Sequence, residues 1–374
     1  MIRFDSRETL VNLDGVMEVI HRAIAVAKIP PNPPLSKGGI TAGICTFLLL
    51  ICSLLMAHGS LLYADTSTGS AFLNIGAGAK SLALGEAYTA RSGDSESLFY
   101  NPAALAELPQ AELSATYSDW LAGTAFGIVS YAQPTRIGTL AAGVLNLGGG
   151  TQDGRDVNRQ PTGTFSANDT EGLLSYSSAI GQWAAIGANA KYLESRIGSD
   201  AASTVAFDAG GFAAAPGPRP LTVGFSVLNI GSGLRFIDQV DRLPLTLALG
   251  TAYKPVSALQ LSADIKHQPY DQATELDMGA EYGLSLFDFR LGYQAPLENS
   301  NDASLSAAER IRGGLGFHIS RFQADYTLAP FGDLGLTQRI TVRILFGLPD
   351  NGPHNLQHAG QAPSAQITEL FPGL

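Results

Sequence analysis

Between Ala111 and Gly347 the chain divides into about fourteen short segments in which apolar and polar residues alternate. A period of two places apolar side chains on one face of a β-strand and polar side chains on the other. From Leu259 to Lys266, for example, leucine, alanine and isoleucine alternate with glutamine, serine, aspartate and lysine. Strands of about 9–11 residues span a bilayer when they are tilted. The pattern predicts an all-β fold, a transmembrane antiparallel β-barrel of about fourteen strands.

The connections between these segments favour the same fold. Most connections after even-numbered strands are short, whereas several after odd-numbered strands are long, such as Gly148–Thr170 and Pro296–Glu309. Outer-membrane barrels carry short turns at one rim and long loops at the other. The alternative is a soluble secreted β-sandwich, which has no reason to keep this difference.

Composition excludes several classes of function. The formal net charge is -10 and 15% of residues are charged, against about 25% in soluble domains. An acidic chain argues against a nucleic-acid partner, which needs a basic surface. Both cysteines, Cys45 and Cys52, lie in an N-terminal apolar stretch. The rest of the chain therefore has no disulfide framework and no thiolate site.

The N-terminal part has the pattern of an export signal. Residues 37–64 begin at Lys37, continue through an apolar run and end with a small residue, Ala64, before an aspartate. This pattern predicts a secretory signal peptide cleaved near Ala64, with a transmembrane anchor as the alternative. Residues 1–36 include a proline-rich run that a signal peptide rarely carries, and we interpret them as a dubious leader or a mis-assigned start. The expected location is the bacterial outer membrane.

The exported part is expected to contain three regions. Residues 65–109 lack alternation and are predicted to form an N-terminal plug segment, irregular or partly helical. Residues 110–348 form the predicted outer-membrane barrel, which contacts outer-membrane lipid. Residues 349–374 are rich in proline, glutamine, histidine and alanine and are predicted to be disordered. A barrel usually ends at its terminal aromatic strand, and this tail departs from that pattern.

Five residues mark the plug motif. Gly76, Gly78 and Gly85 interrupt a run of small residues, and Asn101 with Pro102 gives a turn signal. The run from Gly76 is similar to a phosphate-binding loop, but an alanine replaces the required glycine before the lysine. We therefore expect these glycines to permit close packing of the plug.

Charged residues on the polar face of the strands are predicted to point into the lumen, because a charge facing lipid costs a few kcal/mol at the midplane. They are Asp264, Lys266, Glu275, Asp277, Glu281, Arg290, Arg310, Arg312, Asp325 and Arg343. The alternative is that the carboxylates among them form a catalytic pair or a metal site. We favour a lumen network and predict no catalytic residue, no cofactor and no metal, and therefore no enzyme. No Gly-x-Ser-x-Gly nucleophile motif is present.

Three stretches carry a resemblance to a known family. They are Ala71–Tyr88 running into Leu98–Ala103, then Asn229-Ile230-Gly231 with Leu243-Pro244, and finally Phe322–Tyr326 with Pro330–Gly335 and Gln338–Ile340. These stretches resemble the PorV/PorQ family, which is similar to the FadL-type outer-membrane transporters. The resemblance implies a fourteen-stranded barrel with an N-terminal plug that contains Asn101 and Pro102.

The resemblance implies two alternative functions, because family members differ in role. The first is a FadL-like barrel that transports or holds a hydrophobic small molecule and is gated by its plug. The second is a type IX secretion-associated protein that binds secreted cargo or components of the secretion machinery.

Overall fold

The structure is a computed structural model that describes residues 68–156, 158–215, 221–236, 239–298, 307–332 and 335–347. The predicted leader (1–36), the signal peptide with its cleavage site near Ala64, and the C-terminal tail (349–374) lie outside the described residues.

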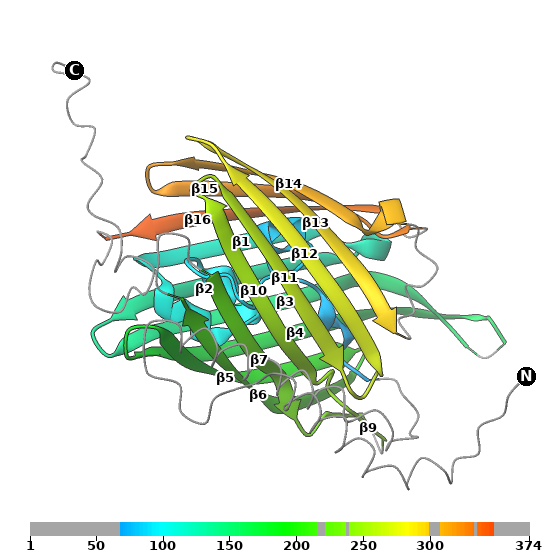
Figure 1. The fold of residues 1–374 in the computed structure, drawn as a ribbon. Coiled ribbons are helices and arrows are strands. Elements are labelled where there is room, and N and C mark those ends of the chain that lie inside the picture. Colours follow the sequence, from blue (N-terminus) through cyan, green and yellow to red (C-terminus); the bar gives the residue numbers. More distant parts are fainter. Residues whose placement is uncertain are drawn as a thin grey trace, which may run out of the picture. The chain divides into compact units, whose positions relative to one another are not determined.

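Fourteen antiparallel strands close into a barrel in which β1 pairs with β16, as the alternation predicted (Figure 1). The barrel strands are β1 (Ala111–Asp119), β2 (Ala125–Thr135), β3 (Gly138–Arg155), β4 (Pro161–Ile180), β5 (Ala184–Ile197), β6 (Asp200–Ala214), β7 (Leu221–Gly231), β10 (Thr246–Val256), β11 (Leu259–Gln268), β12 (Ala273–Gly283), β13 (Phe287–Glu298), β14 (Ile311–Ile319), β15 (Phe322–Pro330) and β16 (Leu336–Phe346). Closure leaves no sheet edge along the wall, which satisfies the backbone without water.

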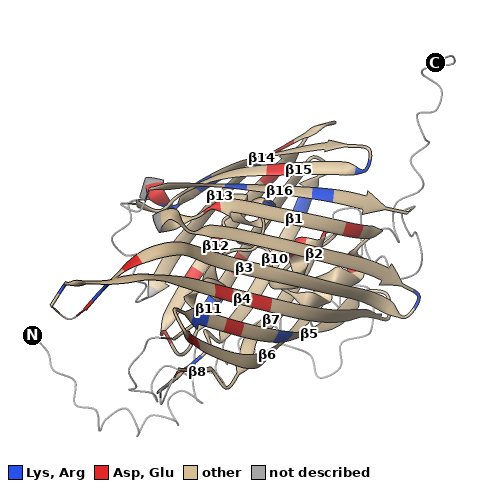
Figure 2. Ribbon diagram, turned by 180° about the vertical axis from the view of Figure 1, so that it is seen from behind, with Lys and Arg blue, Asp and Glu red and all other residues tan. Residues whose placement is uncertain are grey.

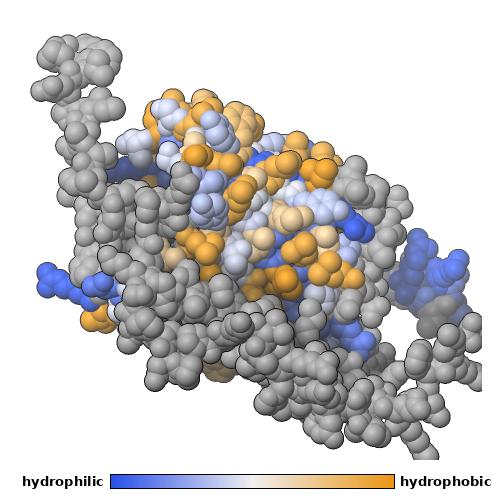
Figure 3. Space-filling view, viewed as in Figure 1, coloured by the Kyte–Doolittle hydropathy of each residue, from blue (hydrophilic) through white to orange (hydrophobic). Residues whose placement is uncertain are grey.

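The two faces of the wall differ in polarity. On β13, Phe287, Phe289 and Leu291 are exposed, whereas Arg290 between them is buried. Figure 3 shows apolar side chains over much of the visible outer wall. Figure 2 shows acidic and basic residues distributed along the strands, many of which are buried inside the barrel. An apolar exterior around a charged interior is the arrangement of a membrane barrel.

The connections distinguish two ends of the barrel. The turn end carries the connections β2–β3, β4–β5, β6–β7, β10–β11, β12–β13 and β14–β15, and the loop end carries the others. Two loop-end connections differ from expectation. Gly148–Thr170 was expected to be a loop, but β3 and β4 pair through most of it as a long hairpin that projects beyond the barrel (Figure 1). The connection after β7 contains a second small hairpin, β8 (Leu234–Phe236) with β9 (Gln239–Asp241).

The sequence did not predict the outer part of the β3–β4 hairpin, because that part has no apolar face. Gly150–Arg155 and Pro161–Phe165 are rich in glycine and threonine and are exposed on nearly every residue. Alternation in sequence reveals a strand when one of its faces is apolar. Here both faces meet solvent, so the strand has no such signal.

Residues 68–110, called the inner segment, lie inside the barrel (Figure 1). Their short helices are η1 (Ala71–Asn74), α3 (Ala79–Ala83), η2 (Ser95–Phe99) and η3 (Pro102–Glu107), and further short helices are η4 (Leu121–Gly123) and η6 (Ala307–Arg310). The α3 helix contacts β13–β16, and η3 contacts β4–β6 on the other side of the lumen. No helix among the described residues is long and apolar enough to cross a membrane.

The inner segment runs along the barrel from the loop end to the turn end. At its start, Thr68 donates hydrogen bonds from its backbone nitrogen and from Oγ1 to Asp271, in the β11–β12 connection (3.0 and 2.8 Å). At its end it enters β1, whose first residue Ala111 pairs with Phe346 at the turn end. The lumen is therefore traversed along its length by a single stretch of chain.

Candidate functional site

Apolar contacts fix the middle of the inner segment against the wall. Phe72, Tyr88 and Tyr100 form a buried cluster with Phe126 on β2 and with leucines on neighbouring strands. The rings of Tyr88 and Tyr100 are 5.4 Å apart. Burial of aromatic side chains of this size contributes strongly to packing, so the inner segment shares a hydrophobic core with the barrel.

Glycines on the inner face of the wall allow the inner segment to approach closely. A Cβ atom added at Gly187 would lie 2.5–2.6 Å from backbone atoms of Pro102 and Ala103. One added at Gly279 would lie 2.7 Å from the carbonyl oxygen of Leu84. Cβ atoms added at Gly224, Gly292 and Gly314 would also lie too close to atoms of the inner segment. Real Cβ atoms do not approach other atoms so closely, so only glycine at these wall positions leaves room for the backbone of the inner segment.

Asn101 and Pro102 begin η3 next to this surface. The Asn101 side chain accepts a hydrogen bond from the Ala103 backbone nitrogen, which caps the helix. Its amide nitrogen donates to the carbonyl oxygens of Thr89, within the segment, and Gly211, on β6 (2.8 and 3.0 Å). Pro102 occupies the first turn, where its missing N–H costs nothing. Asn101 thus joins the inner segment to itself and to the wall.

The three glycines of the motif also lie in crowded places. A Cβ at Gly76 would lie 2.6 Å from Glu86 Oε1, and Gly78 faces the Glu96 carboxylate. Gly85 has φ of +63°, a left-handed conformation that favours glycine, and lies against the backbone of Tyr293. The Gly78–Ser81 turn binds the Glu96 carboxylate through the Ser81 backbone nitrogen at 2.8 Å. An acidic side chain of the protein therefore occupies the place that a phosphate would take.

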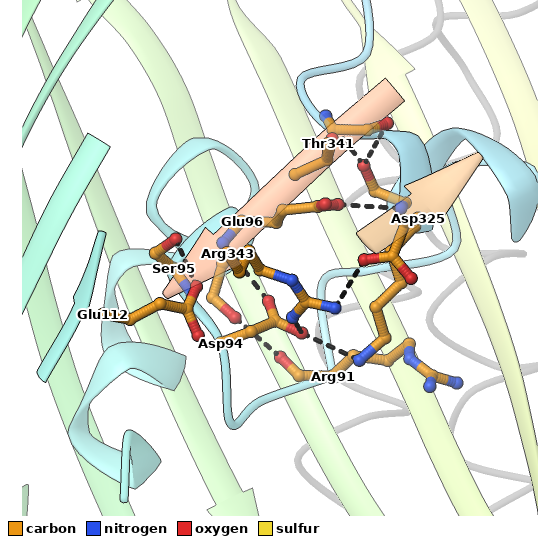
Figure 4. A network of polar contacts seen from close by, with 12 residues as sticks. Arg91, Asp94, Ser95, Glu96, Glu112, Asp325, Thr341 and Arg343 are labelled. Atoms are coloured by element: carbon orange, nitrogen blue, oxygen red, sulfur yellow. Dashed lines mark hydrogen bonds and ion pairs between the residues drawn. The ribbon is translucent and has the colours of Figure 1, made fainter. Parts of the chain in front are cut away.

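One charged network joins the inner segment to β12, β13, β15 and β16. Arg343 contacts Asp325 at 2.6 Å and Asp94 at 3.5 Å, and lies between these carboxylates in Figure 4. Arg290 contacts Asp325 at 2.5 Å and Glu281 at 2.6 Å. Glu281 also accepts from Arg91 of the inner segment at 2.6 Å. The shared carboxylates connect the segment with four strands of the wall.

The pKa values of two carboxyl groups of the inner segment are shifted in opposite directions. Burial opposes ionisation of Asp94, but Lys80 and Arg343 outweigh burial and lower the pKa of Asp94 to about 2. Burial raises the pKa of the Glu96 carboxyl, and the nearby Asp94 charge raises it further. When two carboxyl groups lie close together in a buried site, the charge on one raises the pKa of the other, so their pKa values separate. Asp94 is the ionised partner in the network.

A second network lies nearer the loop end. Lys266 contacts Asp277 at 2.8 Å and Glu86 of the inner segment at 3.4 Å. Arg312 contacts Glu86 at 3.2 Å. Burial opposes ionisation of Glu86, but Lys266 and Arg312 outweigh it and lower the pKa of this carboxyl. These contacts bind the turn after α3 to β11, β12 and β14.

The remaining predicted lumen charges occupy three different environments. Asp264 accepts a hydrogen bond from the Thr89 backbone nitrogen at 2.7 Å and is fully buried. Glu275 lines a cavity at the loop end. Arg310 lies in η6, before β14 begins, and not at a strand position. No group of three or more histidine, cysteine, aspartate or glutamate side chains in the described parts is arranged to hold a metal ion.

Several functional positions were absent from the sequence prediction. Arg339 on β16 is fully buried, donates to the carbonyl oxygen of Gly76 and stacks on the rings of Phe126 and Trp120 (4.6 and 5.3 Å from the centroids). Arg339 lies four residues before Arg343, on the same inward face of β16. The alternation that predicts an inward Arg343 therefore also predicts an inward Arg339. Trp120, directly after β1, packs against the buried cluster that contains Phe126.

A further cluster joins β4, β5 and β6. Lys191 contacts Asp208 at 3.0 Å and Glu171 at 3.4 Å, and donates to Asn229 on β7 at 3.0 Å. Each of these residues is buried. Alternation gives Lys191 an inward position, but nothing local indicates that two acids on neighbouring strands compensate its charge.

A cavity of about 790 Å³ lies between the inner segment and the wall at the loop end. Its apolar lining includes Leu73, Ile75, Phe99, Trp120, Leu145 and Phe331, and its polar lining includes Glu86, Glu171, Lys191, Lys266, Glu275, Gln294 and Arg312. The rings of Trp120 and Phe331 meet edge to face with centroids 5.0 Å apart. A volume of this order suits a small organic molecule.

Solved structures with a similar fold include two proteins described as toluene transporters and one described as a monoaromatic hydrocarbon channel. The toluene transporter TbuX of Ralstonia pickettii has a TM-score of 0.51 at 12% identity, and the match covers 73% of this chain and 99% of that one. The toluene transporter TodX of Pseudomonas putida has a TM-score of 0.52 at 11% identity, with 72% and 99% covered. A TodX deltaS2 mutant, a monoaromatic hydrocarbon channel, has a TM-score of 0.53 at 12% identity, with 73% and 99% covered.

At this level of identity the similarity shows a shared fold. No model of a protein family and no curated protein sequence matches the chain. The structural neighbours are transporter or channel barrels and not enzymes. The shared fold is a closed antiparallel β-barrel, and the chemistry of the site has to be argued from this chain's own residues.

Proposed function

We propose that the protein is a FadL-like barrel of the bacterial outer membrane that takes up or holds a hydrophobic small molecule, with residues 65–109 as its plug. The cavity at the loop end carries this proposal. Its lining combines aromatic and aliphatic side chains with charged ones, and it lies inside the barrel against the inner segment. The similar fold of proteins described as toluene transporters supports the same class of substrate.

The structure suggests how such a plug would act. The inner segment is held against the wall by close glycine contacts and ion pairs. In this proposal it keeps a ligand in the cavity from continuing to the turn end while it stays in place. Release of some of these contacts would open a path along the wall. In this proposal Asn101, Pro102, Gly76, Gly78 and Gly85 shape the plug, and the predicted lumen charges hold it.

The test is uptake of toluene into proteoliposomes that contain the purified protein. The wild type should admit toluene faster than protein-free vesicles, and a variant that lacks residues 68–107 should change the permeability of the vesicles. The proposal fails if the protein in lipid binds no hydrophobic ligand and removal of the inner segment leaves permeability unchanged.

A second candidate function is a platform for protein partners, as in the PorV/PorQ-like alternative with type IX secretion components or cargo. The projecting part of the β3–β4 hairpin favours it, because β2 pairs with β3 as far as Gly148 and β5 pairs with β4 as far as Ala167. Beyond those residues both edges of the hairpin have no neighbouring strand among the described residues. Purification of the tagged protein from outer membranes, followed by mass spectrometry of bound proteins and lipids, separates the two candidates.

The placement in the membrane completes the proposal. Export would be accompanied by cleavage of the signal peptide near Ala64, a few residues before Thr68, which lies at the loop end. N-terminal sequencing of the protein purified from outer membranes tests the cleavage site, and a mature chain that begins before residue 37 would refute it.

A further inference from the structure

We propose that the cavity at the loop end prefers an organic amine, a molecule with an apolar body and a protonated amino group, over the corresponding carboxylate. The inference rests on the proposed function, since it names the class of molecule that the lumen accepts. Binding can nevertheless be measured without transport. The argument starts from the charges that line the cavity and from the partners that each of them has.

Glu275 on β12 differs from the other acids that line the cavity in having no contact with a cation or donor among the described residues. Its side chain lines the cavity, and within the described residues its carboxylate makes no hydrogen bond and no ion pair. Lys266 lies directly opposite Glu275 in the pairing of β11 with β12. The Lys266 ammonium contacts Asp277 and Glu86 instead, at 2.8 and 3.4 Å. Glu275 therefore presents to the cavity a carboxyl group that none of the lining cations contacts.

The cations that line the cavity are already neutralised. Lys266 has two carboxylate partners, Arg312 contacts Glu86 at 3.2 Å, and Lys191 lies between Asp208 and Glu171 at 3.0 and 3.4 Å. A carboxylate ligand would have to displace one of these internal acids to gain a cation. It would also bring a like charge towards Glu275. Both effects disfavour a carboxylate in a partly buried site.

For an amine both effects are favourable, because it needs no internal cation and its charge is opposite to that of a carboxylate. Its ammonium would supply the missing cation at Glu275 and form a charge-assisted hydrogen bond. Gln294 on β13 lies next to this position, because its register partner Asp277 is two residues from Glu275 on the same strand face. Gln294 lines the cavity and makes no hydrogen bond among the described residues, so its amide oxygen offers a second acceptor.

The rest of the cavity suits an apolar body. Phe99 lines it from the inner segment, Leu145 from β3, and Trp120 and Phe331 from loop-end connections. Aromatic rings accept both flat apolar groups and cations on their faces. Trp120 is one of two tryptophans in the chain, the other being Trp183 at the turn end. A ligand in the cavity therefore lies beside a natural fluorescent reporter.

The experiment compares three probes that share one apolar body: 4-phenylbutylamine, 4-phenylbutanol and 4-phenylbutyrate. The full-length protein with Trp183→Phe is reconstituted in lipid nanodiscs at pH 7, and the emission of Trp120 is followed during titration. Empty nanodiscs correct for partitioning of each probe into lipid. We expect the amine to bind at least about tenfold more tightly than the carboxylate, a difference that corresponds to roughly one ion-pair contact in a partly buried site.

Two variants test the role of Glu275. Glu275→Gln keeps the size and the acceptor oxygen but removes the charge, and it should weaken binding of the amine by about tenfold while the alcohol changes by less than about twofold. Glu194→Gln is the matched control, because Glu194 forms an exposed pair with Arg196 on β5 outside the cavity lining. It should leave all three affinities unchanged. Thermal unfolding confirms that each variant is folded.

The possible outcomes separate this inference from the proposed function. Equal binding of the amine and the carboxylate, or undiminished binding of the amine to Glu275→Gln, overturns the inference. Selective binding of the amine by a protein that admits no toluene into proteoliposomes supports the inference and refutes hydrocarbon uptake. Toluene uptake without any preference for the amine refutes the inference and leaves the proposed function standing.

Discussion

The glycine contacts lead to a prediction in which one methyl group tests how the inner segment is held. Gly187 on β5 faces the inner segment, and a Cβ there would lie 2.5 Å from the carbonyl carbon of Pro102, 2.6 Å from the Ala103 nitrogen and 2.6 Å from the Pro102 oxygen. Ordinary contacts of a Cβ begin at 3.4 Å. In Gly187→Ala the inner segment must therefore move by about 0.9 Å, because the paired strand cannot retreat as easily.

The size of the effect follows from the cost of overpacking. An extra methyl group forced into a packed site typically costs about 1–3 kcal/mol. A shift of that size raises the population of a displaced inner segment by a factor of about 5–150. Hydrogen bonds from Asn101 to Thr89 and Gly211, at 2.8 and 3.0 Å, would strain in the same movement.

The assay is labelling of a cysteine introduced at Ala104, which is fully buried in η3. The background lacks Cys45 and Cys52, so that the introduced thiol is unique. Labelling by a water-soluble maleimide reports how often the inner segment leaves the wall. We expect Gly187→Ala to accelerate labelling about 5–150-fold, with the barrel still folded by its thermal unfolding.

Gly172→Ala on β4 is the control, because a Cβ there meets nothing within 4 Å. It shares with Gly187→Ala the gain in strand propensity and the loss of chain entropy in the unfolded state. Labelling at the wild-type rate in both variants would refute the reasoning that the wall glycines hold the inner segment. Equal acceleration in both would assign the effect to the loss of glycine itself.

Three further predictions concern the charges. Arg343→Met should destabilise the protein by about 3–5 kcal/mol in thermal unfolding, because it leaves buried carboxylates without their cation, while the exposed Arg196→Met should stay within about 0.5 kcal/mol. Asp94 has a pKa of about 2 in the folded protein, against an ordinary 3.8, since Lys80 and Arg343 outweigh burial. Its stabilising contribution is complete above the ordinary value and is lost as the pH falls through about 2, so the difference in thermal unfolding temperature between the wild type and Asp94→Asn should shrink only in that range. Glu96 has a raised pKa because of burial, so its ionised form costs stability at pH 7. Glu96→Gln should therefore raise the thermal unfolding temperature at pH 7 and have a smaller effect at lower pH, and a lower temperature at pH 7 would contradict this.

The barrel wall could be predicted from the sequence because its signal is local. A strand with one face towards lipid alternates residue by residue, and the fourteen segments counted on that pattern close into fourteen strands. Alternation failed to predict strands where neither face of the strand is apolar. The extension of β3 and β4 meets water on both faces, and its sequence has the glycine, threonine and aspartate content of a loop.

The site could be predicted in part, and the limit is again physical. Alternation gives the face of the strand on which a charge lies, but it does not name the partner. Arg312 contacts Glu86, which lies 226 residues earlier in the chain. The acids of the inner segment carry no periodic signal, because that segment is built of short turns and helices. Glu86, Asp94 and Glu96 therefore became visible as partners through the three-dimensional structure.

The path of the inner segment determines where an opening would begin. At the turn end the segment continues into β1, which is paired along its length with β2 and β16. At the loop end its first described residues are held by hydrogen bonds from Thr68 to Asp271 and from the Gly69 nitrogen to the Arg242 oxygen. A covalent, fully paired end costs far more to move than an end held by a few hydrogen bonds, each worth about 1 kcal/mol net. Movement should therefore start at the loop end, where the cavity lies, and reach the ion pairs of Asp94 and Arg343 last. In that order a ligand could enter while the deeper network still closes the lumen.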